Sequence, residues 1–298
     1  MLPIISSIQI SLNEHLEVLK NIPGLTWTPG IPQYLLEKSD SELNAIFAPK
    51  QSNIPKHTPQ KSKQHRSTID PPDFLDWSKT RPECINNIRD MKNCGTSQTF
   101  STISVLSDQR CIQHNDTTHV QYSEQFVINC NENGAGCQYM VDRRIPDYLM
   151  EFGTVPDSCF SYKSGENGSA FKCPSTCDDG TPLPILTKIR GYDEISEEWA
   201  DDKPVFEMEK ALMKGPITVL FNVYEDFMFY TGGIYQHSYG QFLDFHRGEV
   251  VGYDEEEGVE YWKIKFSFGT GFGENGFVRI AKGQDECQIE NYALVYEI

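Results

Sequence analysis

The sequence predicts an α+β protein built from two lobes. The earlier part of the chain carries apolar residues at helical spacing, whereas the last third carries β-branched and aromatic runs bounded by turn residues. With 298 residues, of which 38% are hydrophobic, the chain is long enough to bury one large core or two smaller ones. Helices that come first and strands that come later are typical of an α+β architecture.

Two short helices are predicted at the N-terminal end. The first covers residues 8–22, where apolar side chains recur until Pro23-Gly24 ends the pattern. The second begins at Ser39-Asp-Ser-Glu42, which has the form of a capping box, and runs to about Phe47. The next twenty residues are mostly Pro, Gln, Ser, Lys and His, with little to bury. We therefore divide the chain into an N-terminal segment (1–48), a flexible basic linker (49–68) and a body (69–298).

The body is predicted to be helical over about 70–186 and rich in sheet over about 187–298. A long helix is expected from about Ser97 to Ile112, followed by loops rich in Gly, Asn and Cys. The predicted strands are Ile217–Val223, a hairpin over 249–268 that turns at 255–258, and 276–280.

The charge balance limits the classes of partner. Acidic residues outnumber basic ones 43 to 26, which gives a formal net charge of −17. Such a field repels phosphate backbones, so we expect no nucleic-acid partner. No run approaches the ~20 apolar residues that a membrane helix requires, so no membrane span is predicted. We also expect no cofactor.

The nine cysteines favour disulfides over a metal site. Only Cys173 and Cys177 lie at a C-x3-C spacing, and no His pair at ligand spacing lies nearby. Two glycosylation sequons, at Asn115 and Asn167, fit a secretory route to the extracellular space or to a lysosome-like vesicle. Residues 1–12 lack a basic start and a cleavage site, so no signal peptide is evident.

Several segments resemble a known family, in one order along the chain. Cys94-Gly-Thr-Ser97, at the start of the long predicted helix, is similar to the C-G-S-C of papain-like cysteine proteases. Later segments resemble the cathepsin B branch of that family: residues 122–130, 232–237, 260–262, 273–277 and 283–290. Residues 25–30 resemble the short propeptide of that branch. The resemblance implies a papain-like fold, with a helical lobe, a β-barrel-like lobe and a propeptide-like segment before them.

The resemblance places the catalytic positions of that family on residues with altered chemistry. The nucleophilic Cys falls on Ser97, and a hydroxyl, unlike a thiol at a helix N-terminus, needs a strong and well-oriented base. The general base, His246, is retained. The Asn that orients the base falls on Phe266, and the Gln of the oxyanion hole falls on Met91. We therefore expect Ser97 to act as a helix N-cap hydroxyl and His246 to be a polar residue left at a groove wall.

The positions that the resemblance implies for a substrate groove have changed as well. The Trp after the nucleophile is Gln98, and the indole that shields the His–Asn pair is Phe268. Tyr139 and Met140 stand where the family has two glycines, so side chains would enter the space of a bound peptide. The acidic residue at the base of the cathepsin B specificity pocket falls on Tyr292, so a preference for basic side chains should be lost.

The bridge pattern cannot be decided from the sequence alone, because eight cysteines allow many pairings. The resemblance implies four bridges, Cys84–Cys111, Cys94–Cys137, Cys130–Cys173 and Cys159–Cys177. It leaves Cys287 single, and we expect this thiol to pack as a small buried hydrophobe.

Three functions fit these observations. The first is an inactive cathepsin B-like homologue, a pseudopeptidase, whose groove still binds a peptide or protein and also its own N-terminal segment. The second is a residual hydrolase that uses Ser97 and His246. The third is an inhibitor or regulator of an active relative, and it rests only on the N-terminal segment. Hydrolysis of a peptide library, compared with that by Ser97→Ala, separates the first from the second.

Overall fold

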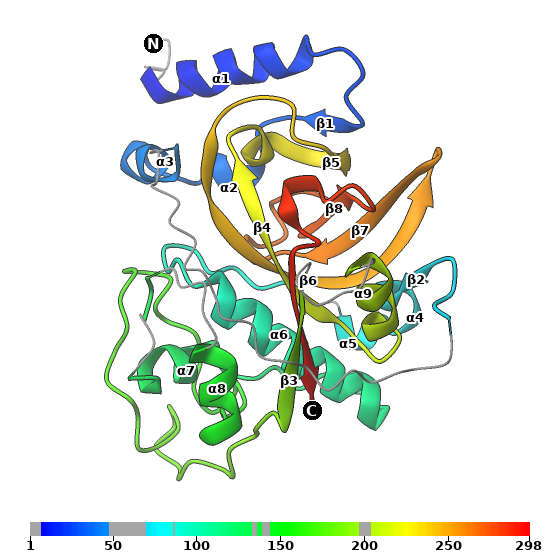
Figure 1. Ribbon diagram of the computed structural model, residues 1–298. Coiled ribbons are helices and arrows are strands. Elements are labelled where there is room, and N and C mark those ends of the chain that lie inside the picture. Colours follow the sequence, from blue (N-terminus) through cyan, green and yellow to red (C-terminus); the bar gives the residue numbers. More distant parts are fainter. Residues whose placement is uncertain (1–6, 48–69, 86, 133–135, 139–143, 197–203) are drawn as a thin grey trace.

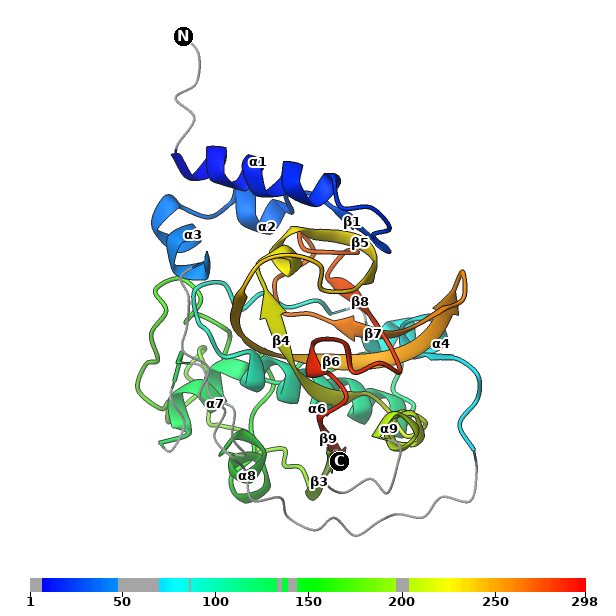
Figure 2. The same ribbon diagram turned by 45° about the horizontal axis from the view of Figure 1, so that its top comes forward.

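The computed structural model describes residues 7–47, 70–85, 87–132, 136–138, 144–196 and 204–298. Figures 1 and 2 show the N-terminal helices on one side of the strands and the helices of the central part of the chain on the other. The predicted linker, residues 49–68, lies outside the described residues.

The N-terminal segment confirms both predicted helices. It contains α1 (Ser7–Lys20), β1 (Trp27–Pro29), α2 (Gln33–Leu36) and α3 (Asp40–Phe47). The capping box is formed: the backbone N–H of Ser39 donates to Oε2 of Glu42 at 2.8 Å, and the N–H of Glu42 donates to Oγ of Ser39 at 3.3 Å. These two bonds satisfy donors that the first turn of a helix leaves open.

β1 attaches this segment to the main sheet. Trp27 pairs with Gly233 of β5 (Tyr230–Tyr235), is 4% exposed, and donates from Nε1 to the carbonyl of Gln236 at 3.0 Å. A Cβ at Gly233 would lie 2.7 Å from the carbonyl oxygen of Thr26, so the close approach of the two strands requires glycine here. Trp27 therefore anchors the segment to the body, since a buried aromatic side chain of this size contributes a large contact area.

The central part of the chain is mainly helical. It comprises β2 (Leu75–Asp76), α4 (Trp77–Thr80), α5 (Pro82–Ile85), α6 (Ser97–His114), α7 (Glu124–Cys130) and α8 (Arg144–Glu151). α6 is the long helix that the sequence predicts, and all its residues from Ser97 to Gln109 are buried. A helix buried all round lies inside the molecule, and Figure 1 shows α6 between the strands and the other helices.

The C-terminal part forms an open sheet. Its elements are β3 (Gly191–Ser196), α9 (Pro204–Leu212), β4 (Ile217–Tyr224), η1 (Asp226–Phe229), β5, β6 (Phe242–Glu256), β7 (Val259–Lys265), β8 (Phe277–Ala281), η2 (Glu286–Gln288) and β9 (Tyr292–Glu297). The strand order is β1-β5-β8-β7-β6-β4-β9-β3, with β2 paired to β6. The predicted α+β architecture is confirmed. The sheet of the barrel-like lobe does not close, because β1 and β3 are separate edges of the described sheet.

The predicted hairpin is formed by β6 and β7. It turns at Glu257 and Gly258, whose φ values of 54° and 82° lie in the left-handed region. Glycine adopts that region readily, which explains why the turn occurs here.

The disulfide framework agrees with the family resemblance. The structure contains Cys84–Cys111, Cys94–Cys137, Cys130–Cys173 and Cys159–Cys177. Cys287 is free and buried, and its burial raises the pKa of the thiol well above the ordinary range. A thiol that remains protonated is a poor nucleophile, so Cys287 packs as a small apolar side chain.

Candidate active site

Ser97 lies at the N-terminal end of α6, but it does not cap the helix. The N-cap residue is Thr96, whose side chain makes no capping hydrogen bond. Oγ of Ser97 instead accepts a hydrogen bond from the backbone N–H of Arg247 in β6, at 3.1 Å. The N-cap role that we expected for Ser97 is therefore wrong: as the first residue of the helix, it faces β6 and ties α6 to the sheet.

The same bond brings Ser97 close to His246, the residue before Arg247. His246 is 5% exposed, and its ring stacks on Phe266 with centroids 4.1 Å apart and an interplanar angle of 25°. The ring of Phe268 packs on it in a T-shaped contact, with centroids 5.1 Å apart. Burial lowers the pKa of His246 to about 3, so the imidazole is neutral near pH 7. Within the described part of the chain, no hydrogen bond joins Ser97 to His246.

The partner of the imidazole is Ser267, which sequence reasoning missed. Oγ of Ser267 lies 3.4 Å from Nε2 of His246. Phe266, at the position expected to orient the base, offers a ring face and no hydrogen-bonding group. The sequence did contain a signal for this contact: Ser267 lies between Phe266 and Phe268, and both of these positions were predicted to lie beside His246.

Met91 offers no side-chain N–H donor. It is 9% exposed, and its backbone N–H donates to the carbonyl of Ser267 at 3.0 Å. Its Sδ lies 3.8 Å from Oγ of Ser267. A thioether accepts hydrogen bonds weakly and donates none, so it cannot stabilise a developing oxyanion.

Tyr292 is covered by a side chain of the same molecule. The guanidinium carbon of Arg247 lies 4.7 Å from the centroid of the Tyr292 ring, and Arg247 is only 1% exposed. This geometry is a cation–π contact in a desolvated place. Sequence reasoning missed Arg247, because β6 also carries Asp244 and Glu249 and a charged residue in such a strand gives no signal of burial.

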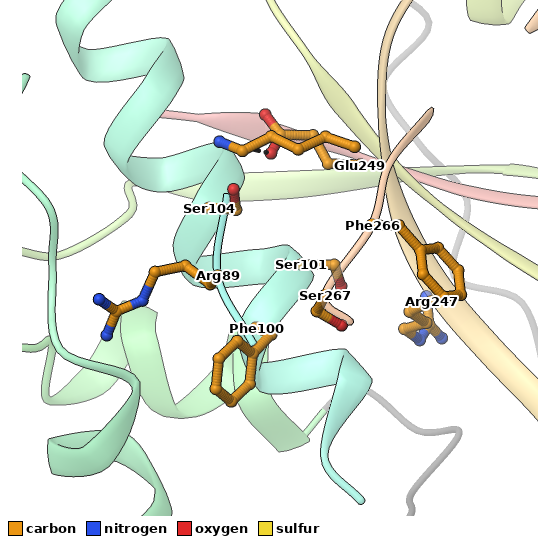
Figure 3. A pocket seen from close by; sticks show the side chains of 9 residues that line it. Arg89, Phe100, Ser101, Ser104, Arg247, Glu249, Phe266 and Ser267 are labelled. Carbon is orange, nitrogen blue, oxygen red and sulfur yellow. Dashed lines mark ion pairs between the residues drawn. The ribbon is translucent and has the colours of Figure 1, made fainter. Parts of the chain in front are cut away.

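Further charged side chains are buried in this region, and Figure 3 draws Glu249 and Arg247 among the residues that line one small cavity. Nζ of Lys265 lies 2.6 Å from Oδ2 of Asp108 in α6 and 3.6 Å from Oε2 of Glu249. Burial, followed by repulsion from Asp108, raises the pKa of Glu249 to about 8. The cavity drawn in Figure 3 measures about 10 Å³, about the room that one water needs. The cluster joins α6 to β6 and β7 and has the composition of a structural ion network.

The N-terminal segment lies over the predicted groove. The ring of Tyr34 in α2 stacks on Phe268, with centroids 4.3 Å apart and an interplanar angle of 3°. Between this segment and the body is a partly open cavity of about 450 Å³, whose walls include Ser97 and His246. The two predicted catalytic positions are therefore brought together in one cavity, with Met91 and Phe268 also in its wall.

The remaining predicted residues are dispersed. Gln98 is buried at 1% exposure, and Asn115 and Asn167 are exposed, so both sequons remain predicted glycosylation sites. Tyr139 and Met140 lie outside the described residues. Among the residues that the structure describes, no three His, Cys, Asp or Glu side chains are placed to hold a metal ion. No described helix is long and apolar enough to cross a membrane.

Known proteins share this sequence pattern. Residues 71–297 match the papain family of cysteine proteases. The chain is 32% identical over 275 residues to the Cathepsin B-like CP3 of Giardia intestinalis, covering 90% of this chain and 88% of that protein. It is 30% identical over 236 residues to Cathepsin B-like cysteine proteinase 3 of Caenorhabditis elegans, covering 74% of this chain and 64% of that protein.

Solved structures share the fold, including the N-terminal segment. ProCathepsin B S9 from Trypanosoma congolense superposes with a TM-score of 0.77 at 23% identity, covering 95% of this chain and 97% of that chain. Digestive procathepsin L 3 of Tenebrio molitor superposes with a TM-score of 0.72 at 22% identity, covering 97% and 88%. At these identities the likeness establishes the fold, and function has to be argued from the site.

Proposed function

This chain belongs to the papain family of cysteine proteases and is cathepsin B-like, and from that premise we propose that it is a pseudopeptidase, a homologue that keeps the groove but not the chemistry. Its N-terminal segment, residues 1–48, stays docked on the groove as a propeptide would. The linker, residues 49–68, and the peptidase-like body, residues 69–298, complete the proposed organisation.

The observation that carries this proposal is the surrounding of His246. A general base works when its imidazole is held within hydrogen-bond reach of the nucleophile and can accept charge as the proton moves. Here the ring is buried against Phe266 and Phe268, whose side chains offer no carboxylate or amide to stabilise an imidazolium. A pKa of about 3 means that a proton accepted from Ser97 would be strongly disfavoured.

The oxyanion side adds to the same deficit. Loss of one oxyanion-hole donor costs about 10²–10³ in rate, or roughly 3–4 kcal/mol of transition-state stabilisation. Met91 provides no such donor. The missing oxyanion-hole donor comes in addition to the missing activated nucleophile. The partial positive charge at a helix N-terminus favours a thiolate, but a serine hydroxyl gains little from it.

A covalent probe tests the state of Ser97. A fluorophosphonate reacts with serine hydroxyls that a base has activated, and intact-mass measurement counts the adducts. We expect no adduct at Ser97 after prolonged incubation of the full-length chain, with an active serine hydrolase as the positive control. Stoichiometric labelling that Ser97→Ala removes would refute the pseudopeptidase.

One contact favours the second function, a residual hydrolase. Oγ of Ser267 lies 3.4 Å from Nε2 of His246 and could orient the neutral ring in place of an amide. If this contact supports catalysis, Ser267→Ala and Ser97→Ala should each abolish the residual hydrolysis. If hydrolysis is absent in the wild type, the contact is structural.

The proposed location is the secretory pathway, ending outside the cell or in a lysosome-like vesicle. Four disulfides in one body are typical of proteins that fold in an oxidising compartment. The proposed ligand of the groove, besides the N-terminal segment, is a peptide or protein.

A further inference from the structure

The cavity of about 450 Å³ between the N-terminal segment and the body is within the size range of small-molecule sites. Its roof comes from α2 and α3, which contribute Tyr34 and Ile46. Because the ring of Tyr34 is stacked on Phe268, the roof takes the space that an extended peptide would need. While the segment remains docked, the cavity has room only for a compact ligand.

The inner wall is apolar. Val223 of β4, Met228 of η1 and Leu243 of β6 line it, and each of them is at most 5% exposed. Phe268 adds an aromatic ring to the wall. Such a wall favours a ligand that is itself mainly apolar, since burying apolar area contributes roughly 25 cal/mol per Å².

The formal charges of the side chains that line the cavity sum to zero. Its charged lining residues are two lysines and two acids, Lys38, Lys92, Glu42 and Asp244, and Nζ of Lys38 lies 4.0 Å from Oε1 of Glu42. His246, in the same wall, is neutral because of its burial. A ligand with a net charge would therefore lose its hydration here without a dedicated counter-charge.

Ser97 provides a hydrogen-bond donor beside the apolar part of the wall. Oγ of Ser97 accepts a bond from the backbone N–H of Arg247, and in the described part of the chain its own proton has no acceptor. A hydroxyl that lines a cavity and can still donate suits a carbonyl or ether oxygen on a ligand.

We propose that the full-length protein binds a small, uncharged and mainly apolar molecule with one oxygen acceptor in this cavity, with the acceptor on Ser97 and the N-terminal segment as the roof. This binding proposal rests on the proposed function, because it requires that the N-terminal segment stays docked and that Ser97 does not act as a nucleophile. The former nucleophile position then serves as a binding group.

The first test is a fluorescence titration of the full-length chain with prodan, an uncharged naphthyl ketone whose emission shifts to the blue in apolar surroundings. We expect saturable binding at one site per chain. Anilinonaphthalene sulfonate, an anion of similar size, should bind at least tenfold more weakly. Absence of saturable prodan binding, or equal binding of the anion, would overturn the proposal.

Variants locate the site. Val223→Phe fills the cavity and should weaken prodan binding at least tenfold, whereas Ile185→Phe adds the same ring at a side chain that is 96% exposed and should change nothing. Ser97→Ala removes one hydrogen bond and should weaken binding about 2- to 12-fold. Unchanged affinity in a folded Val223→Phe variant would place the probe elsewhere and refute the assignment.

A second measurement does not depend on filling the core. In Ser97→Cys, iodoacetamide should alkylate the introduced thiol, and saturating prodan should slow that reaction at least fivefold; the wild type, whose one free thiol is the buried Cys287, is the blank. Alkylation that ignores prodan would count against the proposal. Peptide hydrolysis dependent on Ser97 would instead refute the proposed function, so the two failures are distinguishable.

Discussion

At the scale of single residues, His246 makes the folding stability of the protein depend on pH. Its pKa falls from an ordinary 6.5 to about 3 because the ring is buried, so between these values the unfolded chain takes up a proton that the folded chain does not. Stability from this residue is therefore present above about pH 6.5 and is lost as the pH falls toward 3.

This gives a measurable prediction for His246→Gln, which removes the titrating group. Between pH 7 and pH 5, the wild type should lose about 2 kcal/mol more unfolding free energy than the variant, from the slope of about 1.4 kcal/mol per pH unit and proton. Urea unfolding at the two pH values measures the difference. Equal pH dependence of the two proteins would mean that His246 is solvated and able to act as a base.

At the scale of elements, the ion pair between α6 and β7 holds the helix to the sheet. Asp108 is fully buried and accepts from Nζ of Lys265 at 2.6 Å and from Nε2 of His119 at 2.7 Å. Asp108→Asn leaves the ammonium of Lys265 with Glu249 alone, at 3.6 Å. Breaking one partner of a buried pair costs about 3–5 kcal/mol, and we expect that loss from urea unfolding.

The matched control is an exposed pair of the same chemistry. Glu17 and Lys20 lie 3.0 Å apart on α1, with exposures of 67% and 51%. Glu17→Gln should change the unfolding free energy by less than about 1 kcal/mol. Comparable losses of unfolding free energy in the two variants would show that the buried ion cluster of Asp108, Lys265 and Glu249 is solvated and does not hold α6 to the sheet.

The N-terminal segment is a second element with a defined anchor. After an added protease has cut the linker, the segment of the wild type should still co-elute with the body in gel filtration. Trp27→Ala removes a side chain that packs on Tyr235 at 5.3 Å and should weaken this association by about 3–5 kcal/mol, so the cut segment separates. Val18→Ala, at a position 43% exposed on α1, should leave it bound.

At the scale of the whole molecule, local signals predicted several of the elements, whereas others, such as α7, α8 and β9, were not predicted. Residues close together in the sequence determine the capping box at Ser39 and Glu42, the long helix that begins at Ser97 and the turn at Gly258. The open sheet and the contacts of Ser97, Ser267 and Arg247 join residues distant in the chain, for example Ser97 and Arg247, 150 positions apart. Such pairings depend on the packing of α6 against the sheet and leave no local pattern in the sequence.

The central claim is that the groove persists without peptidase chemistry. Its most direct test is incubation of the pure full-length protein with a broad peptide library from pH 4 to pH 8, with products identified by mass spectrometry. Wild type, Ser97→Ala and Ser97→Cys should give the same background, because Met91 and Phe266 remain in all three. Cleavage by the wild type that Ser97→Ala abolishes, or cleavage that Ser97→Cys restores, would contradict the account.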